Sequence, residues 1–119
     1  MAGERDNDVR FRQDDSCTQV RRGADGSMEV TLAGEFDLST AADLRECLVR
    51  PEVIDAERIR VDLTRVSFLD SSIIGLLVAA CKRVRNAGGS FSVDCGTGPA
   101  RRVLEISGLI EYLQVEEAA

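Results

Sequence analysis

Residues 59–85, IRVDLTRVSFLDSSIIGLLVAACKRVR, decide the fold because the spacing of their apolar residues changes halfway along the stretch. Over residues 59–64 apolar and polar residues alternate, which is typical of a β-strand with one buried face. Over residues 73–85 apolar residues recur every three or four positions, which predicts a helix. The core-facing stripe of that helix is expected to be Ile74, Leu77, Val78, Cys81 and Val84. The stretch therefore predicts a strand followed directly by a central helix.

Asp70-Ser71-Ser72 lies between these two segments. Asp and Ser side chains accept hydrogen bonds from the free N–H groups at the start of a helix, so the cluster predicts the helix N-cap. The same place favours an anion, because the N–H groups are unpaired and the helix dipole is positive there. The cluster has two interpretations at this point, a cap alone or a site for a negatively charged group.

The residues before the central strand predict an antiparallel hairpin. Residues 28–33 alternate between apolar and polar, as a half-buried strand does. A weaker strand is expected at residues 17–22, and Asp25-Gly26 between the two suits the positive φ angles of a hairpin turn.

Two further helices are predicted from capping and breaking residues. Thr40 and Asp43 have the spacing of a capping box, so one helix is expected to begin near Ala41. Pro51 marks the end of that helix or the linker just past it. The other helix is expected over residues 100–106, with a proline in its first turn.

Two strands complete the predicted sheet. Phe91 and Val93 indicate a strand after the central helix, and residues 112–115 indicate a short last strand. A strand, helix, strand passage such as residues 59–93 requires a right-handed crossover and therefore a parallel pair. The predicted fold class is α/β, with a mixed sheet, helices packed mainly on one face and the order β-β-α-β-α-β-α-β.

The length of 119 residues is enough for one domain. We expect that domain to span residues 16–119. Residues 1–15 are expected to form a flexible tail, because they are mostly charged or polar and contain only Val9 and Phe11 as large apolar residues after the first Met.

The composition excludes several classes of function. A formal net charge of −6 disfavours nucleic acid as a partner. The absence of histidine excludes Ser-His-Asp and Cys-His triads and argues against zinc catalysis. The cysteines lack a C-x-x-C pair and no signal peptide is visible, which predicts reduced thiols in a cytoplasmic protein. The longest apolar stretch, residues 73–81, is too short to span a membrane. We predict neither enzymatic activity nor a cofactor or metal.

Two other segments are weaker candidates for a site. Residues 96–99, Gly-Thr-Gly-Pro, match neither a P-loop nor a dinucleotide fingerprint, so we interpret them as a turn before a helix. Glu35 and Asp37 flank Phe36 in a predicted strand-to-helix loop, where carboxylates serve acid/base chemistry or bind a hard cation. Because no further ligands follow in sequence, a solvated loop or a partner contact is the preferred interpretation.

Several separated motifs, in a fixed order, point to one family. The central motif is VSFLDSS at residues 66–72, followed by IGLL at residues 74–77. The others are LAGEFD at residues 32–37, IRVDL at residues 59–63, Gly88-Gly89 and ISGL at residues 106–109. From about residue 17 onward the chain resembles STAS domains, and specifically bacterial anti-sigma factor antagonists. The resemblance implies the STAS fold.

In that family a partner that is both anti-sigma factor and serine kinase phosphorylates the serine directly after the aspartate. The resemblance therefore implies that Ser71, rather than Ser72, is phosphorylated. It implies an antagonist that, when unphosphorylated, binds the anti-sigma factor and releases a sigma factor for transcription, with a phosphatase reversing the modification. The expected partner-binding residues are Glu35, Asp37, Ser39, Thr40, Asp70, Ser72, Ile73 and Gly75.

Ile73 departs from the family pattern, which usually has glycine directly after the two hydroxyl residues. The predicted core stripe is complete without Ile73, so we expect its side chain to stand on the docking surface and enter a partner pocket.

Two alternative functions remain open from the sequence. One is a STAS scaffold subunit of a stress-sensing assembly, which stable copurification in a large particle would favour. The other is a STAS module that binds a nucleotide or lipid, which saturable binding of a small molecule would favour.

Overall fold

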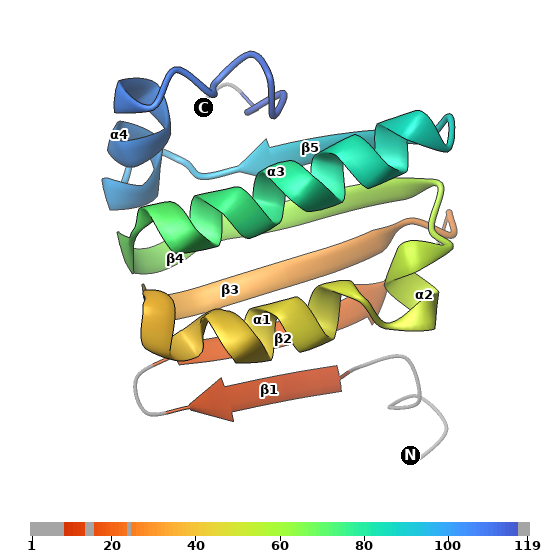
Figure 1. Ribbon diagram of the computed structural model, residues 1–119, viewed down its shortest axis with the longest axis horizontal. Coiled ribbons are helices and arrows are strands. Elements are labelled where there is room, and N and C mark those ends of the chain that lie inside the picture. The colour runs from red at the N-terminus through yellow and green to blue at the C-terminus, as the bar shows by residue number, and fades with distance from the viewer. Residues whose placement is uncertain (1–8, 14–15, 24, 117–119) are drawn as a thin grey trace.

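The computed structural model describes residues 9–13, 16–23 and 25–116 (Figure 1). Within these residues five strands form one sheet in chain order. The strands are β1 Val9–Gln13, β2 Ser16–Arg22, β3 Met28–Phe36, β4 Arg58–Leu69 and β5 Ser90–Asp94. β2 runs antiparallel to both of its neighbours, β1 and β3, whereas β3, β4 and β5 run parallel to one another. The predicted α/β class and mixed sheet are confirmed.

The helices lie mainly on one face of the sheet, as predicted (Figure 1). They are the 3-10 helix η2 Leu38–Thr40, α1 Ala41–Leu48, α2 Pro51–Ile54, α3 Ser71–Asn86 and α4 Pro99–Ile106. The first three α-helices lie in front of the sheet, and α4 packs beside β4 past the end of the shorter β5. Pro51 begins the short helix α2 rather than only ending α1, because proline is favoured at the first helical position.

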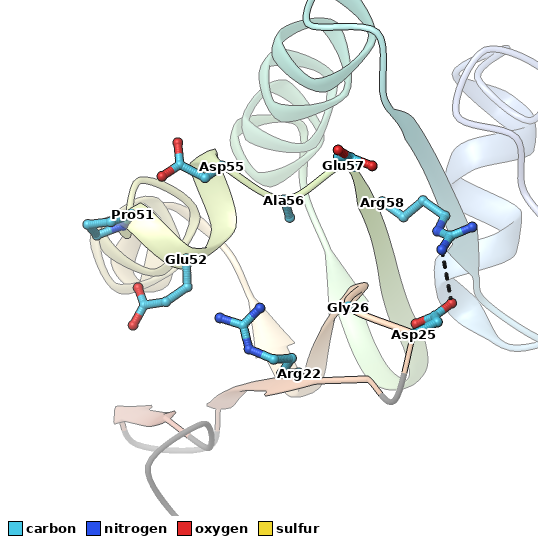
Figure 2. Close-up of a pocket in the computed structure, with 9 residues that line it drawn as sticks. All are labelled: Arg22, Asp25, Gly26, Pro51, Glu52, Asp55, Ala56, Glu57 and Arg58. Atoms are coloured by element: carbon cyan, nitrogen blue, oxygen red, sulfur yellow. Dashed lines mark ion pairs between the residues drawn. The ribbon is translucent and has the colours of Figure 1, made fainter.

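A pocket of about 460 Å³ lies at the amino-terminal end of β4, between α2 and the β2–β3 turn (Figure 2). Charged residues of both signs line it, and Arg58 Nη2 lies 3.4 Å from Asp25 Oδ2. Both side chains of this ion pair are more than half exposed, so it adds little to stability.

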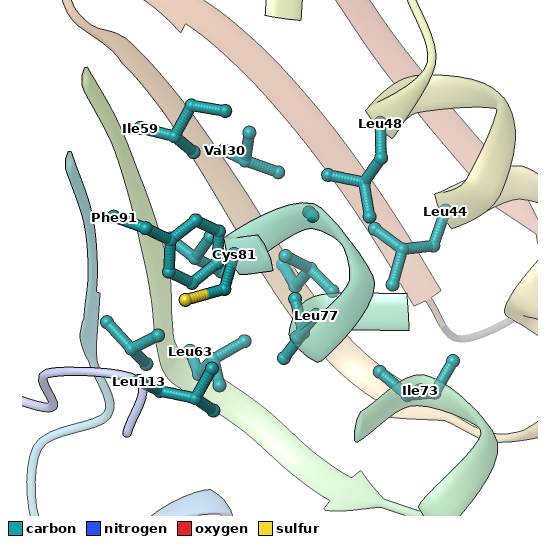
Figure 3. Packing of buried hydrophobic residues seen from close by; sticks show 14 of the residues in the cluster. Val30, Leu44, Leu48, Ile59, Leu63, Ile73, Leu77, Cys81, Phe91 and Leu113 are labelled. Carbon is teal, nitrogen blue, oxygen red and sulfur yellow. The ribbon is translucent and has the colours of Figure 1, made fainter. Parts of the chain in front are cut away.

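The hydrophobic core lies between the sheet and the two longer helices in front of it (Figure 3). Val30, Ile59 and Phe91 project from three neighbouring strands, and Leu44 of α1 and Leu77 of α3 meet them. Alternate strand residues point to the opposite, more polar face. The alternating pattern in the sequence therefore sets which face the helices cover.

Residues 9–13 differ from the predicted flexible tail, because they form the edge strand β1. β1 pairs with β2 in an unbroken antiparallel register from Val9 opposite Val20 to Gln13 opposite Ser16. Its order comes from backbone pairing with the next strand along the chain, which the composition of a segment poor in apolar residues does not reveal. The sheet thus begins before residue 16, and the rest of the predicted tail lies outside the described residues.

The C-terminal segment forms turns and a single bridge, between Val93 and Val115, in place of a full strand at residues 112–115. Leu113 N–H donates to the Leu109 carbonyl at 3.0 Å, and Gln114 has a φ of 53°. A turn and a left-handed residue are incompatible with extended strand geometry. The side chain of Leu113 is buried, so its apolar character reflects the core rather than a strand.

Candidate functional site

The carboxyl ends of β3 and β4 lie side by side, because the two strands are parallel neighbours. The Asp70 N–H donates to the Phe36 carbonyl at 3.2 Å, which ties the two strand ends together. The chain leaves β3 at Asp37 and leaves β4 at Asp70. We call residues 37–40 the first junction and residues 70–73 the second junction.

The second junction is an aspartate-capped helix start, as the sequence predicts. Asp70 has an extended backbone (φ −111°, ψ 180°) at the N-cap of α3. Its Oδ1 accepts hydrogen bonds from Ser72 N at 3.0 Å, Ser72 Oγ at 2.6 Å and Ile73 N at 3.4 Å. The carboxylate therefore satisfies two N–H groups that the helix leaves without an internal partner.

The two serines of this junction have different surroundings. The Ser72 hydroxyl is half-buried and donates to Asp70. Ser71 is exposed as the first residue of α3, and in the part of the chain that the structure describes its hydroxyl has no hydrogen-bond partner. Ser71 is thus the hydroxyl of this pair that a modifying enzyme can reach without breaking a bond.

The first junction repeats the same hydrogen-bond pattern. Asp37 Oδ1 accepts from Ser39 N at 2.9 Å and from Ser39 Oγ at 2.6 Å. The hydrogen bond from the Ser39 hydroxyl is the main cause that holds the pKa of Asp37 below its usual value. Thr40 Oγ1 accepts from Asp37 N at 3.0 Å and completes a capping box. The predicted box of Thr40 with Asp43 is therefore wrong, because η2 precedes α1 and takes the cap.

Two of the expected contact residues are buried. Thr40 is 5% exposed, and its hydroxyl accepts a hydrogen bond from the Asp37 N–H and donates one to the Asp37 carbonyl. Ile73 is 0% exposed and lies among the core side chains (Figure 3), so the prediction that it stands on a docking surface is wrong. The reason is geometric: in the first turn of α3 the apolar band is wide enough to cover both Ile73 and Ile74.

The remaining expected contact residues are accessible to different degrees. Glu35 is exposed but belongs to β3, which continues through residues 34–36 with a register shift instead of ending in a loop. Asp37 and Asp70 are half-buried caps, and Ser39 is exposed. Gly75 is exposed one turn after Ser71, and a Cβ built there meets nothing within 4 Å.

Leu38 is not among the contact residues expected from the sequence, yet its side chain is 75% exposed in the first junction. Leu38 lies between Asp37 and Ser39, so the cap turns its side chain outward. The feature of the sequence that could have indicated its exposure is an apolar residue within an Asp-x-Ser turn, outside the apolar stripe of any helix or strand.

The other segments and side chains considered from the sequence are weaker candidates for a functional site. Residues 96–98 form the predicted turn before α4, with Gly98 as the N-cap and Pro99 as the first residue of the helix. Within the described ranges, no cluster of three or more acidic or cysteine side chains could hold a metal. Nor does any helix in those ranges have the length and apolar character to cross a bilayer. Burial raises the pKa of the Cys47 thiol to about 12, which makes this cysteine unreactive.

The class of protein follows from a comparison of the whole domain with known families. The family model of the STAS domain matches residues 18–118, and the chain belongs to the STAS domain family. Curated proteins similar to it include anti-sigma-B and anti-sigma F factor antagonists. The chain is 32% identical over 91 residues to the anti-sigma-B factor antagonist of Bacillus subtilis strain 168, a match that covers 76% of this chain and 83% of that protein.

Solved structures show the same fold. A crystal structure of an anti-sigma factor antagonist from Mycobacterium paratuberculosis has a TM-score of 0.79 at 24% identity and covers 90% of both chains. The Bacillus cell fate determinant SpoIIAA in its phosphorylated form has a TM-score of 0.64 at 21% identity, over 84% of this chain and 91% of that one.

Proposed function

We propose that this protein is an anti-sigma factor antagonist whose binding is switched off by phosphorylation of Ser71. The observation that carries the proposal is the exposed, unbonded hydroxyl of Ser71 beside the capped helix start. The names of the curated relatives and the phosphorylated state of one fold neighbour support it. The unphosphorylated protein would bind an anti-sigma factor and release a sigma factor for transcription.

The proposed docking surface consists of the exposed parts of the two junctions and Gly75. The anti-sigma factor, acting as a serine kinase, would transfer the γ-phosphoryl group of ATP to Ser71 Oγ, with ADP leaving and the hydroxyl proton passing to a base of the kinase. A phosphatase would restore the free hydroxyl. The protein itself acts by binding and supplies no catalytic group.

Electrostatics explains how one phosphoryl group would end binding. The group adds about −1.5 to −2 charges at neutral pH. Each unit of that charge would repel a partner carboxylate about 4 Å away by on the order of 4 kcal/mol at an effective dielectric of 20, which corresponds to about a thousandfold in affinity. No refolding is required, because the Ser71 hydroxyl makes no hydrogen bond that the fold depends on.

The test uses each purified anti-sigma factor with a serine-kinase domain from the source organism. Incubation with ATP followed by fragmentation mass spectrometry should place the phosphate on Ser71; phosphate only on Ser72 or Ser39 would overturn the site. In titration calorimetry Ser71→Ala should bind as tightly as unphosphorylated wild type does, and it should keep that affinity when ATP is present. Ser71→Asp should bind more weakly, but less so than the phosphorylated protein, because one charge is smaller than two.

A further inference from the structure

A hollow of about 350 Å³ lies between η2, α1 and the start of α3. Its lining residues are Leu38, Ala41, Ala42, Arg45, Ser72 and Leu76. Ser72, which directly follows Ser71 in the chain, is one of these lining residues, so the hollow adjoins the helix turn that carries the proposed phosphorylation site.

The hollow is apolar over most of its lining. Leu38 at its rim is 75% exposed, and Leu76 and Ala41 are only partly covered by the core. A single exposed leucine is ordinary on a protein surface. Here, however, two leucines and two alanines from separate elements line one concave surface, which is the shape that receives an apolar side chain.

Arg45 gives the hollow a charge. It is exposed, and the ion pairs of the described residues involve Arg50, Arg58, Arg60 and Arg101 but not Arg45. Arg45 is the charged side chain among the residues that line the hollow, and its guanidinium is the complement of a carboxylate.

We propose that the hollow receives an apolar side chain of the anti-sigma factor and that Arg45 pairs with a carboxylate next to that side chain. The inference rests on the proposed function and adds the chemistry of the partner segment, an apolar residue adjacent to Asp or Glu. Because the hollow includes Ser72, a phosphoryl group on Ser71 would place negative charge beside the arriving carboxylate.

The test compares dissociation constants of unphosphorylated variants with the anti-sigma factor kinase that binds the wild-type protein. Arg45→Gln should weaken binding about tenfold and Arg45→Glu about a hundredfold, because the second change turns attraction into repulsion. Leu38→Ser should weaken binding about tenfold. Raising the salt concentration should weaken binding of wild type more than binding of Arg45→Gln, because salt screens the charge pair.

Matched controls change the same chemistry elsewhere on the surface. Arg102→Glu reverses an exposed charge on α4, and Ile54→Ser removes an exposed apolar side chain on α2 at the opposite end of the sheet. Both should bind within about twofold of wild type. Leu38 and Arg45 are exposed, so their variants should keep the wild-type unfolding midpoint, measured by circular dichroism.

Three outcomes would overturn the inference. If Arg45→Glu and Leu38→Ser bind as wild type does while Ser71→Asp binds weakly, the hollow is not the contact and the proposed function stands. If Arg45→Gln changes only the behaviour of the phosphorylated protein, Arg45 pairs with the phosphoserine rather than with the partner. If wild type binds none of the purified anti-sigma factors, the proposed function and this inference fail together.

Discussion

The two junctions of the site use one hydrogen-bond pattern with different residues at two positions. In each, an aspartate accepts from the N–H and the hydroxyl of the serine two residues later, with O–O distances of 2.6 Å. The second position is exposed in both and is Leu38 in one and Ser71 in the other. The fourth position is buried in both and is Thr40 in one and Ile73 in the other.

The comparison shows that the shared hydrogen-bond pattern decides which positions of a junction are exposed and which are buried. The side chain that occupies each position then decides what the junction can do. The same aspartate-to-hydroxyl bonds occur at Asp25 with Ser27 and at Asp62 with Thr64, where no helix follows. The pattern is therefore a structural device of this chain and does not by itself mark a site. What distinguishes the two junctions is that they adjoin each other and turn an apolar side chain and a free hydroxyl outward.

The largest expected effect concerns the fourth position of the second junction. Ile73→Gly should lower the free energy of unfolding by about 3–5 kcal/mol, because it removes a fully buried side chain and puts glycine in a helix. Urea unfolding measures the loss. Ile73→Val, expected to cost about 1 kcal/mol, tests the same point if the glycine variant does not fold. A variant as stable as wild type that fails to bind the partner would show that Ile73 is a contact after all.

The caps should show the next largest effect, and an unequal one. Asp70→Ala should lower the free energy of unfolding by about 1–2 kcal/mol, because it uncaps the sixteen-residue helix α3. Asp37→Ala should cost less, because η2 has only three residues. Asp70→Asn keeps an acceptor oxygen and should remain near wild type. Equal losses for the two alanine variants would contradict the idea that the caps differ by the helix that follows them.

Local sequence pattern was enough to predict the parts of the fold that are decided locally. Alternation predicted β3 and β4, and Asp70 with its two serines predicted the start of α3. Sequence could not predict β1, whose five residues are ordered by pairing with β2. Nor could it predict that the apolar segment near Leu113 forms turns, because burial of a leucine looks the same in a strand and in a turn.

The site was predictable in position but not in detail. Asp37, Ser39, Asp70 and Ser71 were all expected, and the structure brings them to adjacent strand ends. The burial of the Ile73 side chain was not predicted. Apolar residues at every third or fourth position locate the centre of the buried face of a helix, but they do not show how wide that face is in the first turn. The width of the buried face depends on how neighbouring helices pack against it, and the sequence of one helix does not give that information.

Gly75 tests whether the exposed surface of the second junction extends along α3. Gly75→Ala should raise the free energy of unfolding by about 0.5–1 kcal/mol, because alanine favours a helix and the added Cβ meets nothing. We also expect it to weaken binding of the anti-sigma factor, since the methyl group would separate the two backbones. Unfolding and affinity measured on the same variant should change in opposite directions. A gain in stability with unchanged affinity would place the partner away from this turn.

The smallest expected effect is a pH effect at the first junction. The Ser39 hydroxyl is the main cause that lowers the pKa of Asp37, so Ser39→Ala should raise that pKa toward the ordinary aspartate value. A carboxyl whose pKa is lower in the folded state stabilises the fold above its unfolded pKa, about 3.9, and loses that contribution as the pH falls through the folded pKa. Wild type should therefore lose more stability than Ser39→Ala below about pH 4. An NMR titration of the Asp37 carboxyl carbon measures the shift directly, and Ser39→Thr, which keeps the hydroxyl, should leave it low. If Ser39→Ala and Ser39→Thr give Asp37 the same pKa, the hydrogen bond from the hydroxyl to Asp37 does not stabilise the pattern that the first junction shares with the second.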